Sequence, residues 1–335
     1  MNRRFVRILM LFVLVILTGK AQTQDVTLSQ FMANPLFTNP ALAGFNLGPR
    51  ASIAYRNQWP SLKADFVSYT ASYDQNVEFL NSGFGASFLS TKIGGDALTT
   101  AVMSGYYAYQ LQASKHLSLS IGLRGSYFQK QLNWNLVNSS TDYDTIKALI
   151  GVGSGEPTTT INDYDIAIGA AFVYKENLFG GLSLEHINTP NISFYSSDTL
   201  NLGMKVSFFA GGNIDIRKKT VRGTHYTPII ISPSIYFQAR TGLQQVSVGS
   251  MLSRGMFFTG AWYRMDFNNE GALVALLGAN YKQFSIGYSF DYSISTATNF
   301  DGGAHEITVS FQVNNGLHKK YKSTKLGPVP SPRFK

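Results

Sequence analysis

Cysteine is absent from the 335 residues, and charged residues are scarce at 14%. Without cysteine, the chain cannot form disulfides or Cys-ligated zinc and iron–sulfur sites. An ordinary soluble domain carries roughly 25% charged residues, so this chain lacks the charges that usually cover a water-facing surface. Aromatic residues make up 13%, which argues against a disordered chain. The formal net charge of +9 suggests an anionic partner, nucleic acid or membrane, until the charges are located.

Long apolar runs are also missing, except at the N-terminus. Ile8–Leu17 is apolar, follows a basic start and precedes the small residues Gly19 and Ala21. This pattern predicts a secretory signal peptide over residues 1–21. The run is shorter than the about 20 residues of a membrane-spanning helix, so an N-terminal anchor is the less favoured alternative. We therefore expect an exported protein.

Period-two alternation dominates the rest of the chain. Apolar and small polar residues alternate over 117–123, 166–174, 283–294 and 306–313. Soluble strands average about five or six residues, whereas several of these segments reach ten or more. Their polar positions hold mostly Ser, Gly, Gln, Thr and Asn, which suits a barrel lumen better than a water-exposed face. The alternation therefore favours an all-β fold, a transmembrane antiparallel up-and-down β-barrel, over a soluble sandwich.

Fourteen segments have strand character, and together they place the barrel at residues 50–313. They are 50–58, 65–75, 82–91, 97–111, 116–129, 163–175, 178–188, 202–216, 226–239, 241–251, 255–265, 270–281, 283–294 and 304–313. An even number puts both barrel ends on one side, which we expect to be periplasmic. The long connections 130–162, 189–201 and 295–303 then face outward, and tight turns face inward. The tyrosines expected in interfacial girdles are Tyr55, Tyr69, Tyr73, Tyr106, Tyr107, Tyr109 and Tyr127.

Residues 22–49 precede the barrel and contain two Asn-Pro pairs, Asn34-Pro35 and Asn39-Pro40. Asn before Pro favours a turn. The apolar residues between the turns predict a packed segment, a short helix at the periplasmic mouth or in the lumen. A passive leader is the alternative.

This segment resembles the N-terminal signature of the PorP/SprF family of type IX secretion proteins. The resemblance rests on Ser29-Gln30-Phe31, Asn34-Pro35, Asn39-Pro40-Ala41 and Ala43-Gly44, and continues through Tyr55-Arg56-Asn57-Gln58-Trp59-Pro60. The closing segment His305–Phe311 is also similar to the family's last strand. From this resemblance we take the following residues as family-motif positions and candidate partner contacts: Gln30, Phe31, Asn34, Pro35, Asn39, Pro40, Gly44, Arg56 and Trp59.

The resemblance implies an outer-membrane component of the type IX secretion apparatus. Such proteins sit with the periplasmic ring and peptidoglycan-associated proteins, and they serve export and surface attachment of cargo and, in gliding bacteria, motility. The expected partners are therefore these proteins, secreted surface cargo and outer-membrane lipid. An outer-membrane pore for small solutes is the alternative function.

Two basic segments are candidates for periplasmic contacts. One is the loop 217–225, with Arg217, Lys218 and Lys219; the other is the tail 314–335, with Lys319, Lys320 and Lys322. Three prolines predict an extended tail, and a merely solvated tail is the alternative. Because the signal peptide and the tail hold most of the excess positive charge, the barrel is nearly neutral and no nucleic-acid partner is expected.

Catalytic and metal-binding patterns are hard to find. The five histidines show no metal-binding spacing such as HExxH, and His186 near Ser183 is a weak hydrolase candidate. The glycine run 151–155 lacks the Lys-Ser/Thr of a nucleotide loop. Acids in and beside the loop 130–162, among them Asp142 and Asp165, could bind divalent ions. We therefore expect no enzyme, no cofactor and no defined metal site.

Overall fold

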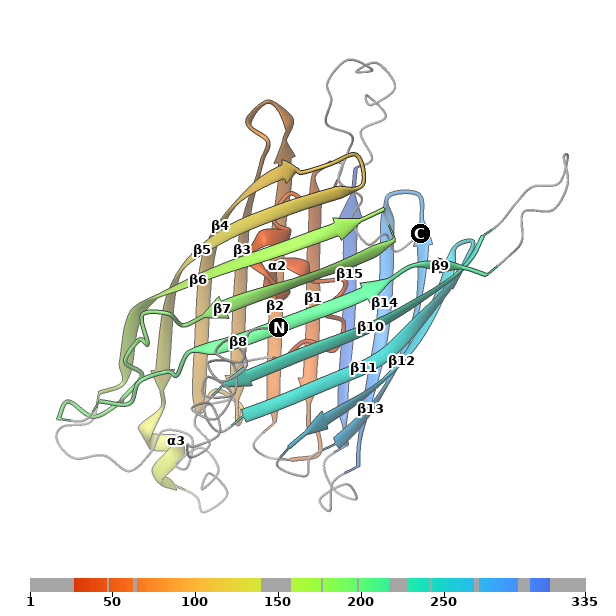
Figure 1. Ribbon diagram of the computed structural model, residues 1–335. Coiled ribbons are helices and arrows are strands. Elements are labelled where there is room, and N and C mark those ends of the chain that lie inside the picture. Colours follow the sequence, from red (N-terminus) through yellow and green to blue (C-terminus); the bar gives the residue numbers. More distant parts are fainter. Residues whose placement is uncertain are drawn as a thin grey trace, which may run out of the picture.

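A computed structural model describes residues 27–46, 48–62, 65–139, 158–175, 177–197, 199–216, 228–240, 243–267, 271–294 and 302–313. Within them, one antiparallel sheet curls on itself (Figure 1). Its strands are β1 (Arg50–Gln58), β2 (Phe66–Val77), β3 (Ser82–Ile93), β4 (Leu98–Gln112), β5 (Leu117–Leu132), β6 (Thr160–Tyr174), β7 (Leu178–Glu185), β8 (Lys205–Gly212), β9 (Ile214–Asp215), β10 (Ile229–Arg240), β11 (Leu243–Arg254), β12 (Phe257–Asp266), β13 (Gly271–Tyr281), β14 (Phe284–Ser293) and β15 (Ala304–Gln312). The short helices are α2 (Pro35–Thr38), η1 (Pro40–Leu42), η2 (Glu78–Leu80) and α3 (Trp134–Ser139).

The sheet closes between its first and last strands. β1 pairs with β15 from Arg50↔Gln312 to Gln58↔Ala304. β8 and β9 pair in turn with the same neighbour, β10, so they form one interrupted strand. The fold is therefore a closed barrel of fourteen strands, which confirms the predicted architecture. Closure leaves no open sheet edge, as a membrane-embedded sheet requires.

Several boundaries of the sequence interpretation are wrong by three residues, and two of them lie around β7 and β8. The expected strand 178–188 ends at Glu185, and the expected strand 202–216 begins at Lys205. His186 and Thr189 have φ values of 57° and 43°, and Pro190 follows. Positive φ breaks the strand pleat, and proline cannot donate to a ladder, so the chain leaves the sheet early.

The barrel has two rims, which we name by the path of the chain. At the basal rim β1 begins at Arg50 and β15 ends at Gln312; at the distal rim β1 ends at Gln58 and β15 begins at Ala304. Helix α3 lies at the distal rim, at the bottom of Figure 1. Short turns such as 255–256 and 282–283 join strands at the basal rim, and the longer connections 133–159 and 186–204 lie at the distal rim.

Side chains alternate between the outer surface and the lumen. On β1, Ile53 is 59% exposed on the outside, whereas Ser52 and Arg56 are 3% exposed and point inward. Tyr55 and Tyr69 pack together on the outer face, with ring centroids 5.3 Å apart. The girdle prediction is wrong for Tyr106, which is 5% exposed, because neighbours in a strand point to opposite faces and Tyr107 takes the outer one. Among the described residues, no helix is both long and apolar enough to cross a membrane.

Candidate functional site: a plug in the barrel lumen

Residues Thr27–Asn46, which we call the plug, run through the lumen from one rim toward the other (Figure 1). Near the distal rim, Gln238 Nε2 donates to Thr27 Oγ1 at 2.9 Å. Near the basal rim, Gly44 N donates to Asp74 Oδ2 at 2.9 Å, and Gln110 Nε2 donates to the Gly44 carbonyl at 2.9 Å. The plug is therefore held at both ends by inward-facing side chains of the wall.

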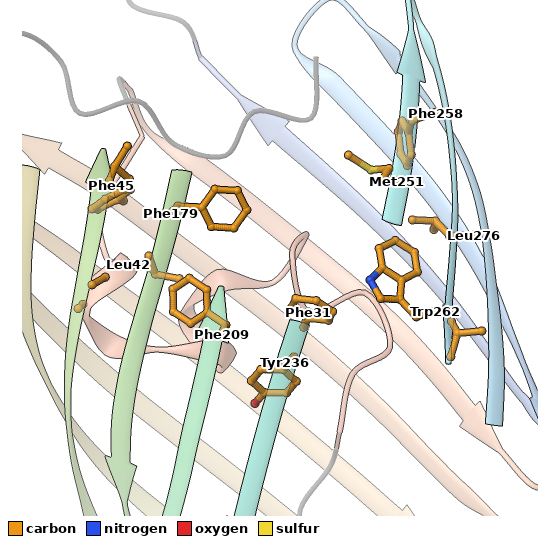
Figure 2. Close-up of a cluster of buried hydrophobic side chains, with 14 residues drawn as sticks. Phe31, Leu42, Phe45, Phe179, Phe209, Tyr236, Met251, Phe258, Trp262 and Leu276 are labelled. Carbon is orange, nitrogen blue, oxygen red and sulfur yellow. The ribbon is translucent and has the colours of Figure 1, made fainter. Parts of the chain in front are cut away.

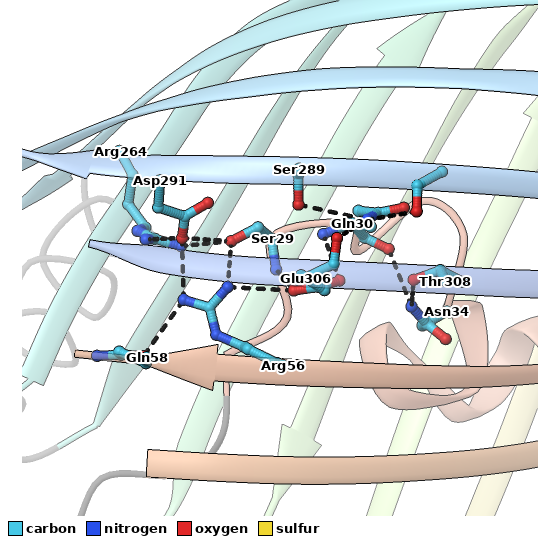
Figure 3. A network of polar contacts seen from close by, with 11 residues as sticks. Ser29, Gln30, Asn34, Arg56, Gln58, Arg264, Ser289, Asp291, Glu306 and Thr308 are labelled. Carbon is cyan, nitrogen blue, oxygen red and sulfur yellow. Dashed lines mark hydrogen bonds and ion pairs between the residues drawn. The ribbon is translucent and has the colours of Figure 1, made fainter. Parts of the chain in front are cut away.

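A buried ion network fixes the distal end of the plug (Figure 3). Arg56 Nη2 lies 2.9 Å from Asp291, and its Nη1 lies 3.1 Å from Glu306. The backbone N–H groups of Ser29 and Gln30 donate to the two Glu306 oxygens at 2.7 and 3.1 Å. Arg56, Asp291 and Glu306 are each at most 3% exposed. The carboxylate thus joins the wall to the backbone of the plug.

Arg264 completes this network from β12. It pairs with Asp291 and donates to Ser29 Oγ at 3.1 Å. Two guanidinium groups therefore face two carboxylates, and the formal charges cancel. Buried charges are tolerated when they are paired and hydrogen-bonded in this way, so the network and the plug stabilise each other.

Gln30 and Phe31 extend the distal attachment. Gln30 Nε2 donates to the Glu306 carbonyl at 3.0 Å and lies 3.4 Å from the Gly287 carbonyl (Figure 3). Phe31 stacks on Tyr236, with ring centroids 5.1 Å apart, and meets Trp262 edge-on at 6.3 Å (Figure 2). Polar contacts thus hold Gln30 against β14 and β15, and aromatic contacts hold the next residue, Phe31, against β10 and β12.

The two Asn-Pro pairs have different tasks inside the lumen. Asn34 Nδ2 donates to the Gln30 carbonyl at 3.3 Å, and Pro35 is the first residue of α2. Asn39 caps η1 by accepting from Ala41 N at 2.8 Å, while its Nδ2 donates to the Leu182 carbonyl of β7 at 2.9 Å. Proline fits the first turn of a helix because its missing N–H would have no partner there. The second pair therefore both starts a helix and attaches it to the wall.

Glycines in the wall allow the plug backbone to come close. A Cβ on Gly122 of β5 would collide with the Pro40–Ala41 backbone. At the basal end, a Cβ on Gly83 would collide with the Ala43 carbonyl, and Gly44 has a φ of 60°. These positions need glycine because any side chain would displace the plug.

A second group of charged side chains lines the lumen on β5 to β8. Arg124 pairs with Glu185 at 2.8 Å and with Asp165 at 2.7 Å. His186 Nδ1 lies 3.0 Å from Asp165, and Lys205 Nζ lies 3.1 Å from Glu185. Sequence reasoning missed this group and the distal ion network. The available signal was a charged residue at an inward position of a strand otherwise poor in charge, as at Arg56 and Arg124.

Comparison with known proteins identifies the family. A family model described as "Type IX secretion system membrane protein PorP/SprF" matches residues 20–311. The chain belongs to the PorP/SprF family. That match confirms the resemblance read from the N-terminal motif, and it covers the plug and the barrel together. The comparison with curated proteins gives no match.

Two solved structures resemble this PorP/SprF protein. The toluene transporter TodX of Pseudomonas putida aligns with a TM-score of 0.50 and 10% identity, covering 88% of this chain and 96% of that one. The outer-membrane protein Omp33 of Acinetobacter baumannii aligns with a TM-score of 0.43 and 10% identity, covering 81% and 100%. At these identities, the TodX likeness shows the outer-membrane barrel fold alone.

The family-motif residues fall into three groups in the structure. Seven lie in the plug: Gln30, Phe31, Asn34, Pro35, Asn39, Pro40 and Gly44. Arg56 lies on the wall beside them. The side chains of Arg56 and of the six plug residues other than Gly44 are buried, and Gly44 lies against the wall. Trp59 stands apart at the distal rim, where its backbone N–H donates to the Gly303 carbonyl at 2.7 Å and its ring meets Phe66 edge-on. The motif thus joins plug to barrel, and a partner could touch its buried side chains only if the plug moved.

The basic candidates lie outside the described residues: Arg217, Lys218 and Lys219 of the loop, and Lys319, Lys320 and Lys322 of the tail. So do the signal peptide, the tail and most of the acidic loop. Asp165 belongs to the luminal charge group instead, which separates it from the proposed divalent-ion site. Among the described residues, no group of three or more acids or histidines could hold a metal ion.

The weak hydrolase candidate lacks its central contact. His186 pairs with Asp165 through Nδ1, while Ser183 Oγ is buried with no hydrogen-bond partner among the described residues. A serine nucleophile needs a histidine within hydrogen-bond reach. The arrangement of these two residues therefore gives no support to a catalytic reading.

Proposed function

We propose that this PorP/SprF barrel is a plugged anchoring platform of the type IX secretion apparatus. Its basal rim binds periplasmic ring or peptidoglycan-associated components, and its distal rim meets secreted surface cargo. The protein acts by binding rather than catalysis. Family membership supports the secretion role, and the plug fixed across the lumen supports a platform over an open pore.

The observation that carries the orientation is the opposite charge of the two rims. Connections at the basal rim carry the cations Lys115, Lys175, Arg217, Lys218, Lys219, Arg222 and Lys282 against the acids Glu78 and Glu176. Connections at the distal rim carry the acids Asp65, Asp96, Asp142, Asp144, Glu156, Asp198, Glu270 and Asp301 against Lys63 and Lys147. The basic tail follows β15 at the basal rim. Such a charge difference steers oppositely charged partners to the two ends.

The lengths of the connections at the two rims also favour a periplasmic basal rim. Outer-membrane barrels have short periplasmic turns and longer extracellular loops. Here the basal turns 113–116, 255–256 and 282–283 are short, and the exceptions include the distal turn 241–242 and the basal connection 216–228. We therefore propose that β1 begins and β15 ends on the periplasmic side. The plug, in contrast, starts at Thr27 near the distal rim, so its N-terminal end lies deep in the barrel rather than at the periplasmic mouth.

Neutralising the basic loop and tail tests the partner side of the proposal. Arg217, Lys218 and Lys219 are changed to Gln, and in a second variant Lys319, Lys320 and Lys322 are changed to Gln. We expect each variant to co-purify from membranes with several-fold less periplasmic secretion protein, and cells to export less surface cargo. Mass spectrometry of the purified complexes measures the first effect.

Lys63, Lys92 and Lys147, changed together to Gln, form the matched control because they remove the same charge from the distal rim, which the proposal does not assign to periplasmic partners. This control should keep its partners. If the unmodified protein purifies alone as a monomer, or if all three variants behave alike, the proposed contacts are wrong.

A further inference from the structure

Two exposed cations lie in adjacent turns of the basal rim. Arg254 is the last residue of β11, and Lys282 directly follows the last residue of β13. The turn 255–256 is hydrogen-bonded to the end of β13, because Asn280 N donates to the Met256 carbonyl at 2.7 Å. No residue named for partner contact belongs to these turns, so we asked what they could bind.

Both cations lie at the end of the apolar outer face of the barrel. On β11, the exposed Leu252 is followed two residues later by Arg254, so both side chains face outward. On β13, the outward Tyr281 is 62% exposed, and Lys282 Nζ lies over its ring, 5.2 Å from the ring centroid. Long cationic side chains at the edge of an apolar surface keep their charged heads at the membrane interface.

Aromatic side chains surround the two cations. Phe257, which pairs in register with Arg254, is 64% exposed. Phe284, which pairs in register with Tyr281, is 55% exposed. Aromatic girdles mark the two levels at which a barrel leaves the bilayer. The cations therefore lie at the depth of the lipid headgroups.

The positive charge of these two turns is not balanced locally. In the part of the chain that the structure describes, neither Arg254 nor Lys282 forms an ion pair with an acid. The segments 253–257 and 280–285 contain no Asp or Glu. Since positive charge near a membrane surface attracts anionic lipid, these turns can hold a phosphate group.

Other exposed lysines near strand ends differ in this respect. Lys175 makes the same contact with its neighbouring tyrosine, at 5.2 Å, but Glu176 comes next in the sequence. Lys92, near the distal end of β3, lies 2.7 Å from Asp96. The turns of Arg254 and Lys282 therefore have the stronger claim on an anionic group.

We propose that Arg254 and Lys282 bind the phosphate of an anionic phospholipid in the leaflet at the basal rim. The acyl chains would lie along the exposed outward side chains Leu252 and Leu277. The position favours a lipid over an acidic protein, because both cations lie on the outer face, where the bilayer surrounds the barrel. This binding site does not depend on the proposed secretion role.

The test is native mass spectrometry of the full-length protein, released from micelles that hold equal amounts of phosphatidylglycerol and phosphatidylcholine with the same acyl chains. The unmodified protein should retain about tenfold more phosphatidylglycerol. Arg254→Gln with Lys282→Gln should lower this ratio several-fold. An excess of inorganic phosphate should not displace the lipid, because the acyl chains contribute to binding.

Lys63→Gln with Lys92→Gln is the matched control, since it removes two cations from the distal rim, and it should keep the ratio. Arg254→Lys with Lys282→Arg preserves both charges and should also keep it, which guards against a misfolded glutamine variant. Equal retention of the two lipids by the unmodified protein, equal losses in both glutamine variants, or displacement by phosphate would overturn the proposal. So would a glutamine variant of Arg254 and Lys282 that loses a co-purifying acidic protein but no lipid.

Discussion

Replacing Leu28–Ala43 by a short Gly/Ser linker should turn the barrel into an open channel. The plug runs between the two rims, and fourteen strands enclose a lumen wider than side chains of the wall alone fill. The wall charges left behind, Arg56 and Arg264 with Asp291 and Glu306, balance one another and tolerate water. In planar bilayers, single-channel current should rise by about tenfold or more over the intact protein.

A control barrel carries the same linker inserted after Ser114, in a basal turn, and keeps its plug. It should conduct no better than the unmodified protein. The plugged-platform account fails if the intact protein already conducts as well as the deletion variant.

Arg56→Leu should destabilise the barrel strongly. Arg56 is 3% exposed and joins Asp291 and Glu306, which are also buried. Removing one partner of a buried ion pair leaves uncompensated charge and typically costs about 3–5 kcal/mol. Urea unfolding in lipid vesicles, followed by the loss of heat-modifiable migration on gels, measures this cost.

The double variant Arg56→Leu with Glu306→Leu removes one charge of each sign, and it should recover part of the lost stability. Tyr55→Leu, on the outer face of the same strand, is the control and should be much milder. Equal losses for Arg56→Leu and Tyr55→Leu would show that the ion network contributes little.

The barrel could be predicted well because the two faces of each strand lie in different environments, one at the apolar outer surface and one in the polar lumen. The period-two alternation predicted the strand segments, for example 283–294, and most predicted strand boundaries fall within a few residues of those in the structure. The error at Tyr106 came from treating neighbouring tyrosines alike, although only one of two neighbours can face outward. The break after Glu185 depends on positive φ at His186, which residue identity alone does not reveal.

The plug shows the limit of sequence reasoning more clearly. The Asn-Pro pairs predicted turns and a packed segment, which the structure contains. The wall partners of this segment are far away in the chain: Gln30 meets Glu306, and Asn39 meets Leu182. Such pairs depend on the curvature and register of the closed barrel, so the sequence left lumen and periplasmic mouth as equal choices.

A disulfide trap tests most directly whether the plug lies in the lumen. The chain has no cysteine, so Asn34→Cys with Thr308→Cys introduces a single pair. At these positions Asn34 Nδ2 lies 3.5 Å from Thr308 Oγ1. The control pairs Asn34→Cys with Ile307→Cys, which is 44% exposed on the outer face. A protease site inserted after Leu47 then frees the plug from β1. After oxidation in native membranes, the plug should stay attached under non-reducing conditions in the Thr308 pair and be released in the Ile307 pair. Release from both pairs would contradict the luminal plug.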